Sequence, residues 1–141
     1  MGILQGMLNN LKEVSKESLE GEFSKYLIEG EEIVTGFKLV RDILLITNFR
    51  IIDFDKQGAS GKKMRVESIY LESICGVSCE TAGFGFDDSE ITIHYITSPF
   101  RKANDINVSS KKYEFPKKFD VSALYSSLEK ISHENVQRLN S

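Results

Sequence analysis

The chain has 141 residues, of which 40% are apolar and 28% charged, and its 18 Lys and Arg against 21 Asp and Glu give a net charge of −3. Disordered and repetitive chains lack this much apolar material, so we expect one folded domain with a short extension. The acidic balance argues against a general nucleic-acid binder and against a peripheral protein of anionic membranes.

The first predicted element is an amphipathic helix over residues 3–19, because apolar side chains recur there at three- and four-residue steps. We expect Gly21 to end it, and a short helical piece near Glu22–Ile28 to follow, with Gly30 as its C-cap. The apolar stripe of the first helix could pack on the domain itself, on a neighbouring subunit or on a membrane. Its members are Ile3, Leu4, Met7, Leu8 and Leu11.

From residue 32 onward the apolar period changes to two, which predicts a succession of strands. Turn residues separate them, with an asparagine at Asn48 and two glycines in the loop 55–61. Parallel crossovers are excluded because no helix-length gap lies between the strands, so an antiparallel arrangement remains. The predicted strands are Ile33–Leu39, Asp42–Thr47, Arg50–Asp55, Lys63–Tyr70, Ile74–Thr81, Glu90–Ile96 and a run within Asn107–Phe115.

A helix is predicted to follow the last strand. Asp120 is a suitable N-cap, and Phe119 and Leu124 can form a hydrophobic staple around it. The side chains expected to face the core are Val121, Leu124, Tyr125, Leu128, Ile131, Asn135 and Leu139.

Helix, about seven antiparallel strands and helix is the element order of a pleckstrin-homology fold. Over roughly residues 1–95 the chain resembles the bacterial pleckstrin-homology-like family. The most specific marks are the turn Thr47-Asn48 with Arg50, and the hairpin pattern D-K-Q-G-x-x-G-K-K that begins at Asp55. Other matching stretches are Glu29-Gly30-Glu31, Phe37–Asp42, Glu80–Gly83, and Phe86-Asp87 with Ser89-Glu90.

The resemblance implies an α+β fold, a pleckstrin-homology-like barrel of two near-orthogonal antiparallel sheets capped by the C-terminal helix. Residues 1–30 would then form an N-terminal helical extension, and residues 31–141 the domain itself. The resemblance further implies cyclic homo-oligomers whose task is protein–protein interaction, and it does not imply an enzyme. We therefore expect a cytoplasmic, non-catalytic scaffold without a cofactor or metal, whose partners are copies of itself and an unidentified protein.

Polar residues at strand ends and turns are candidates for the docking surface of that scaffold. Mixed-sign groups on a rigid sheet suit a protein partner of complementary charge. The residues assigned to this surface are Lys38, Arg41, Asp42, Arg50, Lys62, Glu80 and Asp87. The rival interpretation makes them internal ion pairs that hold loops in place. Alternative functions are a peripheral anionic-lipid-binding module and a small-ligand binder in the barrel mouth.

Motifs that resemble catalytic or ligand sites have simpler interpretations. The glycine-rich stretch 58–63 lacks the Ser or Thr of a phosphate loop at Lys63 and precedes a predicted strand, so a hairpin is expected. A calcium loop starting at Asp53 would place Met64 where the bidentate Glu is required. Cys75 and Cys79 lie about 13 Å apart along a strand, too far for a disulfide, and are expected to be small buried thiols.

Overall fold

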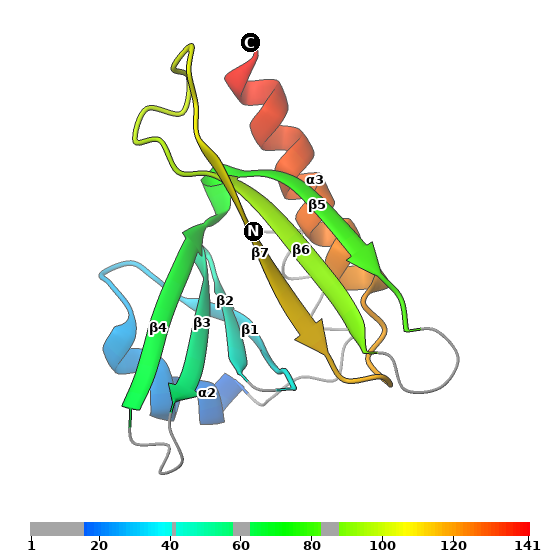
Figure 1. The fold of residues 1–141 in the computed structure, drawn as a ribbon. Helices are drawn as coiled ribbons and strands as arrows, with labels where there is room; N and C mark the ends of the chain where they lie inside the picture. The colour runs from blue at the N-terminus through cyan, green and yellow to red at the C-terminus, as the bar shows by residue number, and fades with distance from the viewer. Residues whose placement is uncertain (1–15, 41, 58–62, 83–87) are drawn as a thin grey trace. The chain divides into compact units, whose positions relative to one another are not determined.

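The computed structural model describes residues 16–40, 42–57, 63–82 and 88–141 (Figure 1). Contacts within the chain divide it into two compact units, Met1–Ile69 and Tyr70–Ser141. Each unit contains one antiparallel sheet, so the seven predicted strands are confirmed. The apolar stripe at residues 3–11 lies outside the described residues, and the predicted division at residue 30 stays a prediction.

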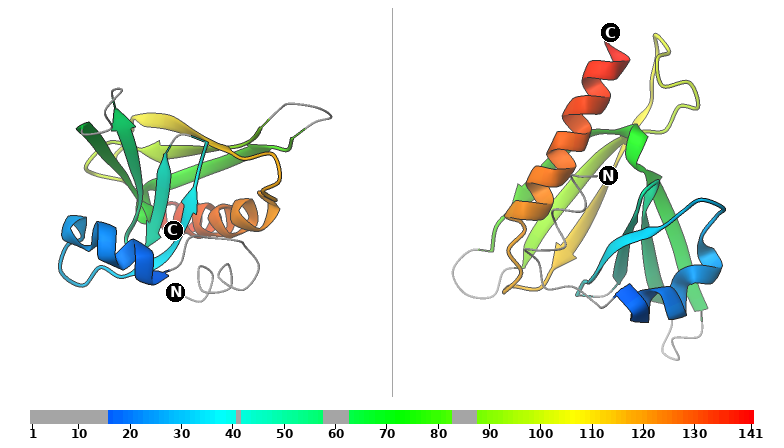
Figure 2. Two further views of the ribbon diagram at one scale, coloured as in Figure 1. Left: turned by 90° about the horizontal axis from the view of Figure 1, so that it is seen from below. Right: turned by 180° about the vertical axis from the view of Figure 1, so that it is seen from behind.

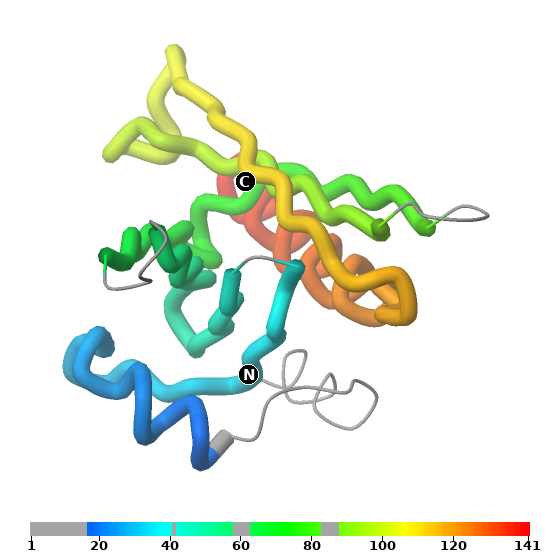
Figure 3. Tube along the Cα trace, turned by 60° about the horizontal axis from the view of Figure 1, so that its bottom comes forward, coloured from blue at the N-terminus to red at the C-terminus, as the bar shows by residue number. Residues whose placement is uncertain are grey.

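The first unit contains a helix, a 3-10 turn and a four-stranded sheet in the order β1-β2-β3-β4. Hydrogen-bonded antiparallel pairing places Gly36 opposite Leu45, and Leu45 opposite Ile52. The tube trace in Figure 3 shows the chain passing from the helix through the turn into the first strand. The elements are α2 (Lys16–Phe23), η1 (Ser24–Tyr26), β1 (Ile33–Lys38), β2 (Ile43–Thr47), β3 (Arg50–Gln57) and β4 (Lys63–Tyr70).

The prediction that Gly21 ends the first helix is wrong, because α2 continues to Phe23. Leu19 and Phe23 lie four residues apart on one face of α2, and both are buried in the core. Their packing outweighs the modest preference of glycine for a helix end. Gly30 has φ +82° and lies in the turn closed by the bond from Glu31 N to Ile28 O at 3.0 Å, rather than at the end of a helix.

The core of the first unit lies between α2 and one face of the sheet. The rings of Phe23 and Phe54 have centroids 4.2 Å apart, and Tyr26 meets Phe54 edge-on at 5.3 Å. Period-two alternation explains why Ile52 and Phe54 share this face of β3. The buried members of this core cluster are Leu19, Phe23, Ile33, Leu45, Ile52 and Phe54.

The second unit contains a three-stranded sheet in the order β5-β6-β7 and the C-terminal helix. The helix packs against β5, and both views of Figure 2 show it running along the sheet. Across both units the strand bounds differ from the predicted ones by at most two residues, and those of β4 agree with the prediction. The elements are η2 (Leu71–Ser73), β5 (Ile74–Glu80), β6 (Ser89–Ile96), β7 (Val108–Phe115) and α3 (Ser122–Leu139).

The predicted buried face of α3 is confirmed in its main members. Val121, Leu124, Leu128, Ile131 and Asn135 are buried, whereas Tyr125 and Leu139 are half-buried. The helix begins at Ser122, and Asp120 accepts a hydrogen bond from the Ser122 N–H at 3.0 Å without being its N-cap. Phe119 stacks on Phe115, with ring centroids 4.9 Å apart.

Candidate functional site

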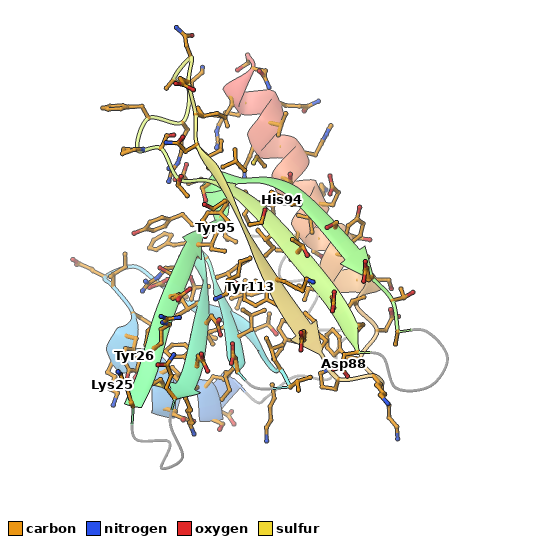
Figure 4. All side chains as sticks on the ribbon, in the orientation of Figure 1. Lys25, Tyr26, Asp88, His94, Tyr95 and Tyr113 are labelled. Carbon is orange, nitrogen blue, oxygen red and sulfur yellow. The ribbon has the colours of Figure 1, made fainter. Side chains whose placement is uncertain are left out.

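A connected polar cluster of the first unit joins Glu31, just before β1, to the turn between β2 and β3. Arg50 Nε donates to Glu31 Oε2 at 2.8 Å, and Arg50 Nη2 donates to Glu31 Oε1 at 2.9 Å. This two-point geometry is the strong form of an Arg–carboxylate pair. The Glu31 side chain is fully buried and that of Arg50 is 14% exposed. Arg50 Nη2 also donates to the carbonyl of Tyr26, a residue labelled in Figure 4, at 2.9 Å.

Thr47 and Asn48 complete this cluster from the turn. The Thr47 hydroxyl donates to Glu31 Oε2 at 2.6 Å and accepts the Arg50 N–H at 3.0 Å. The Asn48 side chain accepts the Glu32 N–H at 2.8 Å and donates to the Gly30 carbonyl at 3.0 Å. The Asn48 side chain therefore accepts from and donates to the backbone just before β1, as the backbone of a neighbouring strand would.

The hydrogen bonds also determine the ionisation of Glu31. Burial alone raises the pKa of a carboxyl group, because the charged form loses water. Hydrogen bonds from Arg50, Thr47 and the Ile28 N–H outweigh that effect and hold the pKa of Glu31 below its usual value. Glu31 is therefore an anion at neutral pH, and the cluster is a satisfied, charged network.

Arg50, which we predicted for a docking surface, thus forms an ion pair within the subunit. The sequence does not identify Glu31 as its partner, although a signal is present. In an antiparallel β1–β2 pair, the start of β1 lies beside the end of β2, so Glu31 must lie near the Thr47–Arg50 turn.

Three aspartates form a second polar cluster at the other end of the same sheet. β2 pairs with β3 so that Leu44 lies opposite Asp53, which places Asp42 beside Asp53 and Asp55. Burial, followed by hydrogen bonds and repulsion from Asp53 and Asp55, raises the pKa of Asp42 to about 7. A proton on Asp42 relieves its like-charge repulsion from Asp53 and Asp55.

The other predicted docking residues are distributed over the chain. Lys38 is exposed at the end of β1, and Asp42 is half-buried in the same hairpin, where Leu39 N donates to Asp42 O at 2.8 Å. Arg50 lies at the opposite end of the sheet from this hairpin. Glu80 is exposed at the end of β5 in the second unit. Arg41, Lys62 and Asp87 lie outside the described residues.

β4 is one of the two edge strands of the four-stranded sheet, β1 being the other, and side chains on both faces of β4 are exposed. Of its eight residues, Met64 is half-buried and only Ile69 is buried. Val66 is 38% exposed and Tyr70 is 49% exposed. Arg65 and Glu67 lie on one face, where Arg65 Nε is 3.3 Å from Glu67 Oε1. A long exposed edge strand is a template for pairing with another chain.

Groups with catalytic or metal-binding chemistry are sparse. Within the described ranges, His, Cys, Asp and Glu side chains form no group of three that could hold a metal ion. Cys75 and Cys79 are half-buried rather than buried, and neither forms a disulfide. His94, labelled in Figure 4, has Nδ1 2.6 Å from Ser110 Oγ on the neighbouring strand. No helix in the described part of the chain has the length and apolar character to span a membrane.

Comparisons with known proteins agree on one family. The family model described as "Bacterial PH domain" matches residues 2–132. An uncharacterised Bacillus subtilis protein, YjqA, is 43% identical over 93 residues, which cover 66% of this chain and 74% of that protein. A pleckstrin homology domain from Shewanella amazonensis has a TM-score of 0.64 at 29% identity, and the match covers 92% of this chain and 97% of that one. A protein with a pleckstrin-homology domain from Shewanella loihica has a TM-score of 0.63 at 28% identity, covering 87% and 97%.

Proposed function

This chain belongs to the bacterial PH domain family, and we propose that it is a non-catalytic scaffold that self-associates into a closed cyclic oligomer and docks a protein partner. The observation that carries this proposal is the exposed edge strand β4. An unpaired edge gains backbone hydrogen bonds when another chain adds to it, and in a closed assembly every copy of β4 is paired, so this edge recruits no further chain.

The sequence of β4 favours a second copy as the added strand. The smallest closed assembly is a two-fold dimer, in which β4 pairs antiparallel with the same strand of its partner. Centring this pair on Val66 places Arg65 opposite the partner subunit's Glu67, and Glu67 opposite the partner subunit's Arg65. Opposite charges on directly facing residues stabilise an antiparallel pair, whereas like charges destabilise it.

Charge exchange tests this interface. Arg65→Glu places carboxylates opposite each other at two symmetric positions, so we expect it to shift the assembly toward monomer. The double variant Arg65→Glu, Glu67→Arg restores opposite charges and should restore the assembly. Sedimentation velocity at about 50 μM detects interfaces with dissociation constants in the micromolar range. A wild-type chain that sediments as a monomer at that concentration would refute self-association.

Docking is proposed at exposed charges that are not committed to the Glu31–Arg50 pair. Lys38 in the first unit and Glu80 in the second each meet this description, and an oligomer would present each of them in several copies, so weak single contacts would gain avidity. Lys38→Glu and Glu80→Lys should each abolish capture of a partner from lysate, with a thermal midpoint within a few degrees of wild type. Capture should also weaken as salt rises, because exposed charges are screened over ~10 Å at 0.1 M. Undiminished capture by both variants would exclude this surface.

A further inference from the structure

The second unit contains a cavity of about 240 Å³ that is lined by five aliphatic residues together with polar ones. Its lining comes from the start of β5, the end of β6, the loop that joins β6 to β7, and the last turns of α3. Two of its side chains, Ile106 and Val136, are 40% and 38% exposed. The aliphatic lining is Ile96, Ala103, Ile106, Val136 and Leu139. Covering this surface with an apolar group lowers the free energy, because apolar area is removed from water.

Two cations line the cavity, and among its described lining residues none is acidic. Arg101 is already committed to the protein. Its Nη1 donates to the carbonyls of Ile96, at 3.2 Å, and Ser98, and its Nε and Nη2 donate to Glu72 Oε1 at 3.3 and 3.0 Å. Arg101 therefore holds the loop in place, and Glu72 balances its charge.

Lys102 is the cation that remains for a ligand. Its side chain is exposed, and its ammonium group lies 3.4 Å from the backbone oxygen of Ser141, which is longer than a typical N–H···O hydrogen bond. Cys75 adds no charge beside it, because burial raises the pKa of its thiol and keeps it protonated at neutral pH. The cavity thus combines five aliphatic side chains with Lys102, a cation that has no carboxylate side-chain partner among the described residues, and Arg101, Cys75 and Asn140 complete the lining.

We propose that this cavity binds the aliphatic tail of a medium-chain monocarboxylate, with the carboxylate group at Lys102. Bidentate binding of a phosphate or other dianion uses the donor fork of an arginine, and the fork of Arg101 is engaged, so the single charge of Lys102 suits a monoanion better. The volume corresponds to roughly eight water-sized groups at about 30 Å³ each, which fits a chain of about six to eight carbons. This inference goes beyond the proposed scaffold function.

Titration with a series of sodium carboxylates tests the aliphatic part of the proposal. We expect affinity to rise about threefold to fourfold per methylene from butyrate to octanoate, as buried hydrocarbon requires, and to level off beyond the length that the cavity holds. Octylammonium tests the charge, because its cation would face Lys102. Equal binding of octylammonium and octanoate, or no dependence on chain length, would overturn the proposal.

Variants at the cavity separate this site from nonspecific binding. Lys102→Glu reverses the charge, and Ala103→Leu fills the cavity from an exposed loop position, so each should weaken octanoate binding at least tenfold. Lys130→Glu, on the exposed face of α3, is the matched control and should bind as wild type does. Thermal midpoints close to wild type would show that each variant is folded. Wild-type affinity in both Lys102→Glu and Ala103→Leu would overturn the proposal.

Cys75 provides an independent report of occupancy, because its thiol lines the cavity. In a Cys79→Ser background, octanoate should slow alkylation of Cys75 by iodoacetamide. In the reciprocal Cys75→Ser background, alkylation of Cys79 should not change, since Cys79 does not line the cavity. Unchanged alkylation of Cys75 at octanoate concentrations that saturate the titration would place the ligand elsewhere and overturn the proposal.

Discussion

The side chain of Leu19 in α2 lies directly against the backbone of Gly36 in β1. A β-carbon built on Gly36 would lie 2.5 Å from Leu19 Cδ1 and 3.2 Å from Leu19 Cδ2. Leu19 is 1% exposed and packs within the core cluster of the first unit, so it has little room to move away. A glycine at position 36 is therefore needed for α2 to lie this close to the sheet.

Gly36→Ala should destabilise the protein by about 1–3 kcal/mol, because the added methyl group overpacks a filled core. Gly21→Ala is the matched control, since a β-carbon there meets nothing within 4 Å and Gly21 lies inside α2. Alanine in a helix interior is favoured over glycine by about 0.5–1 kcal/mol, so the control should stabilise. Denaturant midpoints measure both changes in stability. If both variants shifted the midpoint in the same direction, the packing described for Gly36 would be contradicted.

Arg50→Ala should destabilise by about 3 kcal/mol, because it leaves the buried carboxylate of Glu31 without its countercharge. Lys112→Ala is the comparison, since it removes an exposed pair in which Lys112 Nζ lies 3.5 Å from Glu90 Oε2. Exposed pairs contribute at most about 1 kcal/mol. Urea unfolding at pH 7 measures the stability of the two variants. Similar losses of unfolding free energy would mean that the Glu31–Arg50 pair stabilises the protein no more than an exposed pair does.

The same pair predicts a response to acid. The pKa of Glu31 is lowered in the folded protein, so its contribution to stability is present above its unfolded pKa and is lost as pH falls through the folded value. Wild-type stability should therefore fall steeply below about pH 4, the ordinary range of a Glu carboxyl. Arg50→Ala should show a shallower fall, because the hydrogen bonds from Arg50 that lower this pKa are gone.

Asp42→Asn should raise the thermal midpoint by a few degrees at pH 8 and leave it nearly unchanged at pH 4. Because the pKa of Asp42 is raised to about 7, its stabilising contribution is complete below the unfolded value of 3.8 and is lost as pH rises through 7. Asparagine removes the charge that repels Asp53 and Asp55. Asp105→Asn, at an exposed loop position, should show no such pH dependence. Destabilisation by Asp42→Asn at pH 8 would contradict the repulsion described for this cluster.

Leu128→Ala should cost about 2–5 kcal/mol, because it leaves a cavity beneath α3, where Leu128 is 1% exposed. Lys130 lies on the outer face of the same helix, and Lys130→Ala should cost under about 0.5 kcal/mol. Denaturant midpoints compare the two variants. If they were equal, the helix would not use the face that the structure assigns to its core.

The periodic pattern predicts most of the fold because each element has one apolar face. The buried face of α3 follows directly from its three- and four-residue spacing. The pattern even places Asn135 on that face, but it gives no reason for a buried amide. The structure supplies the reason, since Asn135 Nδ2 donates to the carbonyls of Leu71 and Ile74 at 2.7 and 2.9 Å.

The polar clusters are less predictable because they depend on which strand ends meet. Arg50 has the same local sequence character as an exposed docking residue, and only its pairing with Glu31 makes it internal. The raised pKa of Asp42 likewise requires the β2–β3 register, which sequence alone does not determine. The cavity beside Lys102 depends on a loop conformation held by Arg101, and no periodic pattern describes such a loop.

The two bonds of Asn135 bear on how the protein matures during synthesis. They join the last helix to residues 61 and 64 positions earlier. The carbonyls of Leu71 and Ile74 therefore cannot form these bonds until residue 135 has been synthesised. Ribosomes add roughly 5–20 residues per second, so translating the 18 residues of α3 takes about one to four seconds. During that interval α3 does not yet cover its face of β5, and transiently exposed apolar surface of this kind favours aggregation.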